Sequence, residues 1–374
     1  MAAGANKLPW WAESILLPVL NLVAAFVVSG LVVFGLGEDP FQVLSLLVEG
    51  AFGFQEGISY SLYYATNFIF TGLAVSIAFH AGHFNIGGEG QAMMGGLGLT
   101  LAVFAFAGFQ FIGMSPLLSI LLAIIASMAF GAAWAFLPAY LQAKRGSHIV
   151  ITTIMFNFIA SAFLGYLLVG PLQRPGGQMQ ESADFPDTVS LSGIHELLGM
   201  VGYQFEEGPM NVSLLIALVC AVAFWFLLWR TRFGFELRVA GQNPSAARFA
   251  GISVSRMTIY ALMISGALAG MMGLNELLGE QHRLIGNFTL GYGFVGIAVA
   301  FMGRNHPVGI VIAALLFGAL YQGGAELAFE MPSIQRDFII VIQGLVILFA
   351  GAMPHLFRTP VAKVFSMVNK GSTI

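Results

Sequence analysis

Residues 230–256 read RTRFGFELRVAGQNPSAARFAGISVSR and separate two long apolar runs. The stretch carries five arginines against one acidic residue, Glu236, and a basic loop between two membrane spans is typical of the cytoplasmic side. Within it, Asn243 suits a helix N-cap, Pro244 suits the first helical turn and Gly251 suits a helix end. We therefore expect a short capped helix on the inner face, placed to dock a soluble partner. The alternative is an ordinary cytoplasmic loop that follows the positive-inside rule.

The rest of the chain has the composition of a membrane protein. Of its 374 residues, 58% are hydrophobic and 9% are charged, whereas a soluble domain carries about 25% charged residues. The mean hydropathy is +0.85. These values predict an all-α polytopic membrane protein with a single transmembrane domain, residues 1–374, in a lipid bilayer. Cys220 is the one cysteine, and His80 and His83 lack a third ligand nearby, so we expect no metal, no cofactor and no nucleic-acid partner.

Ten apolar stretches come close to the roughly 20 residues that a membrane-spanning helix requires. They are residues 15–36, 58–79, 89–110, 116–142, 148–170, 211–229, 257–278, 289–302, 307–328 and 337–353. We interpret the first as a retained span and not as a signal peptide. With the N-terminus inside, every Lys and Arg except Arg174, Arg283 and Arg336 falls on the inner side. This bias predicts a bacterial inner-membrane protein with both termini in the cytoplasm.

The order of the spans indicates internal symmetry. Spans within residues 58–170 and 257–353 form two groups of four in opposite orientation, around a central cytoplasmic coupling loop at 230–256. This is the layout of an inverted repeat, which places a transport path at the repeat interface. Residues 40–54 are expected to form a short amphipathic segment on the outer face, and residues 171–210 an acidic outer insert. The acidity is either ordinary for an outer loop or suited to contact with a binding protein.

One polar cluster lies at the expected membrane depth. Residues 81–95 read AGHFNIGGEGQAMMG and place Asn85, Glu89 and Gln91 among five glycines. A charged group in a span costs about 2.5–3.5 kcal/mol on insertion scales, so its presence indicates a structural or functional role. The glycines favour a broken or re-entrant backbone, which is tolerated where protein or a water-filled cavity satisfies the freed amides. The segment is therefore a pore or gate element, or a cytoplasmic turn in which Glu89 caps a helix N-terminus.

Two further polar groups complete the candidate substrate pathway. Thr153 and Asn157 share about one face of the fifth span, where they either bind a sugar or base or hold neighbouring helices together. Asn275 and Glu276 lie near the outer end of the seventh span, and they either line an outer vestibule or sit in the headgroup region.

Several of these stretches resemble one family. Residues 84–91, FNIGGEGQ, are similar to a signature of permeases in the nucleoside, simple-sugar and branched-chain amino acid branch of ABC importers. Further stretches resemble the nucleoside and sugar permeases of that branch, in the same order along the chain: residues 152–157, 170–172, 240–252 and 293–303. The resemblance covers most of residues 60–350.

The central basic loop takes part in this resemblance. Ala246, Ala247 and Gly251 match the core of the "EAA---G" loop of ABC-importer permeases, although Ser245 replaces the glutamate. In that family the loop forms a coupling helix that sits in a groove of the cytoplasmic ATPase. The resemblance thus implies coupling roles for Gln242, Asn243, Pro244, Ala246, Ala247, Arg248 and Gly251.

The resemblance implies the permease subunit of an ABC importer that passes nucleosides across the cytoplasmic membrane. The alternatives are a simple-sugar or branched-chain amino acid permease of the same architecture, or a stand-alone ion-coupled transporter that uses Glu89 or Glu276. Expected partners are a cytoplasmic ABC ATPase, an identical or related second permease subunit, and an extracytoplasmic substrate-binding protein. None of the lysines lies in a Walker A motif, so we expect ATP hydrolysis on a separate chain and no enzymatic activity in this one.

Overall fold

The computed structural model is all-helical in its described regular structure, apart from two isolated β-bridges. The described residues are 9, 11–12, 16–35, 37–110, 115–331, 340–342, 344–345, 348–349 and 357–371. The all-α class predicted from the sequence is confirmed for this part of the chain. The expected span at 337–353 falls largely outside the described residues.

Six of the described helices are long and apolar enough to cross a membrane. They are α3 (Gln55–His80), α5 (Pro116–Tyr140) with its π-helical extension η2 (Leu141–Arg145), α6 (Ile149–Val169), α8 (Ser213–Arg230), α11 (Val254–Gly270) with its π-helical extension η4 (Leu274–Gln281), and α13 (Pro307–Glu330). Each of the six overlies a span expected from the sequence. Helix α4 (Gly88–Gln110) overlies a further expected span.

Three other apolar helices are described besides these six and α4. They are α1 (Leu17–Gly35), α2 (Pro40–Phe52) and α12 (Tyr292–Met302). Helix α12 replaces the expected span at 289–302 and has 11 residues, so it rises about 16 Å, roughly half of a ~30 Å hydrocarbon core. It starts abruptly because the preceding residues Leu290 and Gly291 have φ angles of 45° and 81°, which no helix can continue through.

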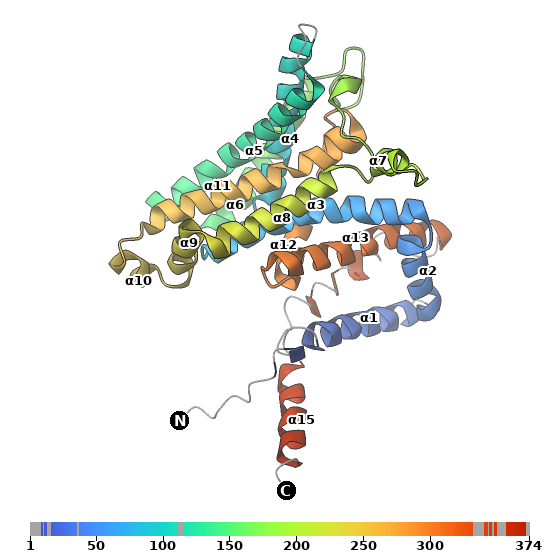
Figure 1. Ribbon diagram of the computed structural model, residues 1–374, viewed down its shortest axis with the longest axis vertical. Coiled ribbons are helices and arrows are strands. Elements are labelled where there is room, and N and C mark those ends of the chain that lie inside the picture. The colour runs from blue at the N-terminus through green and yellow to red at the C-terminus, as the bar shows by residue number, and fades with distance from the viewer. Residues whose placement is uncertain are drawn as a thin grey trace. The chain divides into compact units, whose positions relative to one another are not determined.

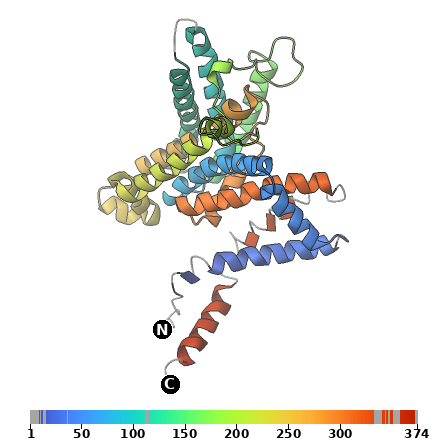
Figure 2. The same ribbon diagram turned by 45° about the vertical axis from the view of Figure 1, so that its right-hand side comes forward.

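The chain divides into two compact units, residues 52–321 and residues 1–51 with 322–374. In the first unit, α3 packs against α8, α11 and α12, while α4 packs against α5, α6 and α11 (Figure 1). Helices α5 and α11 approach closely at Gly131, where the backbone oxygen of Gly266 occupies the space that a side chain would need. The absence of a side chain on Gly131 makes this approach possible. Helices α9 (Arg232–Gln242) and α10 (Pro244–Phe249) follow the end of α8 that lies opposite α7 (Ile194–Met200), and they stay together at one end of the long helices in Figure 2.

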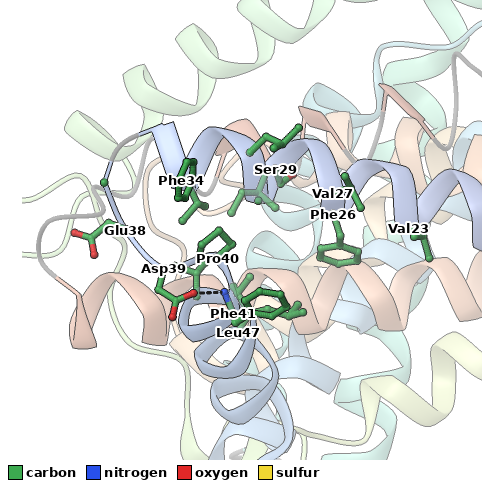
Figure 3. A pocket seen from close by; sticks show the side chains of 17 residues that line it. Val23, Phe26, Val27, Ser29, Phe34, Glu38, Asp39, Pro40, Phe41 and Leu47 are labelled. Atoms are coloured by element: carbon green, nitrogen blue, oxygen red, sulfur yellow. Dashed lines mark hydrogen bonds between the residues drawn. The ribbon is translucent and has the colours of Figure 1, made fainter.

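The second unit has its own apolar contacts. Val33 of α1, Val43 and Leu47 of α2, and Leu327 of α13 form a buried cluster with Ile342. Helices α1 and α2 also line an apolar cavity of about 1060 Å³, in which Phe26, Phe34 and Phe41 are prominent (Figure 3). The C-terminal helix α15 (Arg358–Gly371) packs against Leu17 through an apolar face that includes Val361 and Phe365.

Candidate functional site

The glycine-rich segment 81–95 is a partly buried turn followed by a helix start. The chain leaves α3 at His80 and becomes helical again at Gly88. Asn85 is 1% exposed; its Oδ1 accepts from the Gly87 N–H (2.8 Å), and its Nδ2 donates to Ser265 Oγ (2.9 Å). Because Ser265 lies about three turns into α11, the turn enters the bundle instead of crossing its end. Residues 81–87 thus form a turn, and α4 begins at Gly88, where this turn ends within the bundle.

Asn157 of α6 holds the backbone on both sides of this helix start. Its Oδ1 accepts from the Gly90 N–H (2.9 Å), and its Nδ2 donates to the Ile86 carbonyl (2.9 Å). Gln91 adds a side-chain bond, since its Oε1 accepts from Asn85 Nδ2 (3.0 Å). Thr153 donates to Ile149 O of its own helix (2.8 Å). The polar groups of Asn85, Gln91, Thr153 and Asn157 therefore have protein partners in this structure.

Glu89 joins two helix starts. It lies in the first turn of α4, and its carboxylate accepts from the N–H groups of Gly291 (2.9 Å) and Gly293 (2.8 Å) and from Thr289 Oγ1 (2.5 Å). A side chain on Gly293 would collide with the backbone nitrogen of Glu89, so the two helix starts are in close contact. Each helix N-terminus carries about half a positive charge, which one buried carboxylate offsets. Glu89 therefore caps a helix N-terminus, and the helix that it caps is α12.

A second buried network surrounds Asn275 and Glu276 in η4. Asn275 is 0% exposed; its Nδ2 donates to Asn67 Oδ1 (2.9 Å), and its Oδ1 accepts from Asn211 Nδ2 (3.0 Å) and Ser213 Oγ (2.8 Å). Glu276 is 3% exposed and accepts from Asn67 Nδ2 (2.5 Å). The structure thus buries Glu276 among protein groups, which differs from an exposed position in the headgroup region.

Sequence reasoning missed the partners in this network. Asn67 lies in the middle of an expected span, and an amide side chain at that depth indicates a buried polar contact that the sequence could have predicted. Asn211 and Ser213 lie at the start of a span, where a polar residue is common and gives no signal.

Aromatic side chains gather beside this network and were also missed. Tyr63, Tyr64, Phe68, Tyr292 and Tyr321 form ring contacts with centroids 5.0–6.1 Å apart. They come from α3, α12 and α13, so only the fold brings them together. The available signal was the spacing of the tyrosines in α3, which places Tyr60 and Tyr64 on one helix face.

The end of the larger unit away from α9 and α10 carries the acidic insert, residues 171–210 (Figure 1). Arg174 and Arg283 pair there with Glu181 (3.6 and 3.1 Å) and Asp184 (2.9 and 3.3 Å), so part of its charge is neutralised. Four glutamates line a polar cavity of about 470 Å³ at this end: Glu56, Glu196, Glu207 and Glu280.

The central basic loop folds as the sequence predicts. Helix α10 spans Pro244–Phe249, and Asn243 caps it by accepting from the Ala246 N–H (3.0 Å) through Oδ1. Gly251 follows with a φ of 77°, a conformation that glycine adopts without strain. Gln242, Asn243, Pro244, Ala246 and Arg248 are exposed, whereas Ala247 is buried. The exposed face of α10 is therefore available to a partner.

Phe249 is the residue of this loop that the sequence reasoning passed over. It is 95% exposed, although it is a large apolar side chain in a polar loop. An exposed aromatic residue among charged and polar neighbours is a common anchor in protein–protein contacts.

The loop also touches the 81–87 turn. A side chain on Gly241 would collide with His80 O, and one on Gly82 would lie 2.9 Å from Gly241 O. The backbone that precedes α10 thus lies directly against the turn that leads to Asn85 and Glu89. Within this turn, His83 contacts Thr258 Oγ1 of α11 (2.8 Å), and burial lowers the pKa of His83 from its usual 6.5.

Comparison with known proteins supports a transport role. A family model described as "Branched-chain amino acid transport system / permease component" matches residues 57–351. The glucose ABC transporter permease protein of Haloferax volcanii is 35% identical over 89% of this chain and 86% of its own. The guanosine ABC transporter permease protein of Bacillus subtilis is 34% identical over 90% of this chain and 93% of its own. The nucleoside ABC transporter permease protein of Lactococcus lactis is 30% identical over 90% of each chain.

Proposed function

Because this chain belongs to the family of branched-chain amino acid transport system permease components, we propose that it passes nucleosides across the membrane as the permease subunit of an ABC importer. ATP hydrolysis in such an importer takes place on a separate subunit. The chain itself provides the path and transmits the conformational change.

The relatives and the composition support a neutral polar substrate. The three relatives above are named for guanosine, nucleosides and glucose, all of which are uncharged. A charged substrate requires a counter-charge within the membrane, and both buried acids described above already have protein partners. Glucose or another simple sugar is the second candidate, because the relative from Haloferax volcanii is named for glucose.

The main support for a coupling role is that one face of α10 is exposed and ends in the exposed side chain of Phe249. We propose that this face, formed by Gln242, Asn243, Pro244, Ala246, Arg248 and Phe249, docks the ATPase. Ala247 and Gly251 hold its shape, the first as a buried contact and the second as a left-handed helix end. Force on α10 reaches the turn through the contact between Gly241 and Gly82.

The two helix starts joined by Glu89 are the proposed gate. Discontinuous helices that begin inside a bundle form the substrate sites of many transporters, because their N-terminal amides are free to bind polar groups. In this structure the Glu89 carboxylate accepts hydrogen bonds from the amides at the start of α12. The start of α4 is held by hydrogen bonds of Asn85, Gln91 and Asn157. A shift of the 81–87 turn would therefore separate these helix starts and change access along the path. Thr153 lies one turn before Asn157 on the same helix, and we assign it to the wall of the substrate path. Asn275 and Glu276 form the outer part of that wall.

The charge distribution supports an orientation with α10 in the cytoplasm. Residues 52–321 contain ten Lys and Arg, and only Arg174 and Arg283 lie at the insert end of the helices. We propose on this basis an inner-membrane protein with about ten spans, both termini inside, and the acidic insert facing an external binding protein. The pair of helix starts at α4 and α12 supports an inverted repeat within one transmembrane domain, and a second permease subunit completes the path.

Uptake of radiolabelled guanosine tests this function. Cells that lack the gene should lose uptake that unlabelled nucleosides compete with and unlabelled glucose does not. A strain with a substituted Walker A lysine in the partner ATPase should lose uptake equally, which separates an ABC importer from an ion-coupled transporter. Unchanged guanosine uptake with loss of glucose uptake would reject the nucleoside assignment and keep the architecture.

A further inference from the structure

An apolar groove of the larger unit lies between α8 and α13 and has no role in the proposed path. Its volume is about 390 Å³. One wall includes Leu218, Val222 and Trp225, which recur at helical spacing on α8, and the other includes Val308 and Ile312, one turn apart on α13. Every described residue that lines this α8–α13 groove is apolar.

The groove is open along its length. Val222, Val308 and Ile312 are exposed, and Trp225 is half-buried. Helices α8 and α13 are both long and apolar enough to cross a membrane, so these side chains face either lipid chains or another protein. Apolar walls alone fit both, and the charges at the end of the groove distinguish them.

A cation lies at one end of the groove. Arg230 is the last residue of α8, and its guanidinium carbon lies 4.9 Å from the centre of the Trp225 ring. Trp225 comes more than one helical turn before Arg230, so the Arg230 side chain runs back along the helix towards the groove. Its charge therefore lies beside a residue that lines the groove, and not beyond the end of the helix.

This guanidinium is available to an anion. Arg230 is exposed, and no acidic residue in the described part of the chain forms an ion pair with it. Arg232, by contrast, pairs with Glu236 (2.8 Å). A guanidinium has several N–H donors, so contact with one ring still allows it to bind two oxygens of a phosphate group.

A second pair of tryptophan and arginine continues the same face of α8. Trp229 comes one turn after Trp225, and the guanidinium carbon of Arg238 lies 5.9 Å from the centre of its ring. The ring of His306, the residue before α13, lies 5.2 Å from that of Trp229. Tryptophans beside arginines, at the end of an apolar surface, are typical of the level where lipid chains meet headgroups.

We propose that the α8–α13 groove binds an anionic phospholipid, with an acyl chain along the groove and the headgroup phosphate on Arg230. Basic residues at the inner membrane surface attract anionic lipids, and the assignment to the inner leaflet rests on the proposed orientation with α10 in the cytoplasm. Since α9 begins at Arg232, the bound headgroup would also hold the start of the coupling loop at the membrane surface.

Quenching of tryptophan fluorescence by brominated lipids tests the site. The purified permease is placed in phosphatidylcholine bilayers that contain increasing amounts of brominated phosphatidylglycerol or, separately, brominated phosphatidylcholine. Bromine quenches a tryptophan at close range, so the quenching that is lost in Trp225→Phe reports on the groove. The test variant is Arg230→Gln. The matched control is Arg232→Gln, which removes an exposed arginine nearby that pairs with Glu236.

We expect brominated phosphatidylglycerol to quench Trp225 at an about fivefold lower lipid fraction than brominated phosphatidylcholine, which is the contribution of one cation near an anionic surface. Arg230→Gln should abolish this preference while both lipids still quench, and Arg232→Gln should retain it. Because both leaflets contain the same lipids, the result does not depend on the proposed orientation.

Equal quenching by the two lipids in the wild type, or a preference that survives in Arg230→Gln, would overturn the proposal and leave ordinary lipid contact. If neither lipid quenches Trp225, protein covers the groove, for example a second copy of the permease, and the proposal also fails. Guanosine uptake in cells decides the proposed function separately, so failure of one can be told from failure of the other.

Discussion

The two buried polar networks of the larger unit use the same residue types but bind different partners. Around Glu89, a carboxylate and two asparagines bond mainly to backbone groups at the starts of α4 and α12. Around Asn275, asparagines, a serine and a glutamate bond mainly to one another's side chains. Backbone amides at a helix start have few other partners, whereas side chains can change rotamer and pair again. The first network therefore holds the two helix starts in one arrangement, and its bonds to the start of α12 break together if the 81–87 turn shifts. The second network tolerates rearrangement of single side chains.

Replacing Glu89 should produce the largest effect and tests this difference most directly. Glu89→Ala leaves Thr289 Oγ1 and the N–H groups of Gly291 and Gly293 buried without an acceptor. At about 1–3 kcal/mol for each orphaned group, we expect a loss of about 3 kcal/mol or more of stability and loss of transport. Thermal unfolding of the purified permease in detergent measures it. The control Glu236→Ala, which removes an exposed ion pair with Arg232, should change stability by less than about 1 kcal/mol.

Replacing Asn67 should have a smaller effect. Asn67→Ala removes one partner each from Asn275 and Glu276, but Asn275 keeps its bonds to Asn211 and Ser213. We expect a loss of about 1–2 kcal/mol in the same unfolding assay. Thr66→Ala is the matched control, because Thr66 bonds only to Leu62 O of its own helix among the described contacts. A loss as large as that of Glu89→Ala would mean that the second network is as rigid as the first.

Replacing Phe249 should leave both networks intact. Since Phe249 is 95% exposed, we expect Phe249→Ala to change the stability of the isolated permease by less than about 0.5 kcal/mol. Transport and stimulated ATP hydrolysis should fall about tenfold or more in the assembled importer, as for an interface anchor. Phe235→Ala on α9, where Phe235 is 57% exposed, is the control. Equal activity of the two variants would remove Phe249 from the docking surface.

The smallest effect concerns pH at the edge of the first network. Burial lowers the pKa of His83, so the folded protein holds it neutral while the unfolded chain takes up a proton below about pH 6.5. Stability should therefore fall as the pH drops from 6.5 towards the lowered pKa and should level off below it. The His83→Gln variant should show a weaker decrease over this range. An identical pH dependence in both proteins would contradict the burial of His83.

Local chemistry made part of this fold predictable. The capped helix at Asn243 and Gly251 follows from turn-forming residues within ten positions, and the six long helices follow from apolar length alone. The substrate-pathway residues were chosen because polar groups are costly in a span, and all seven are buried. Their partners could not be predicted, because Glu89 meets Gly291 and Gly293 across two hundred positions.

The half-length helix α12 also affects how the chain enters the membrane. With 11 residues it is too short for the insertion machinery to recognise as an independent span. Its exposed N-terminal amides are costly in lipid until Glu89 accepts from them, and Glu89 belongs to a helix made much earlier in synthesis. The carboxyl-terminal part of the permease therefore depends on the amino-terminal part for its integration as well as for its packing. A substitution at Glu89 would be expected to appear in the cell first as misassembled, rapidly degraded protein.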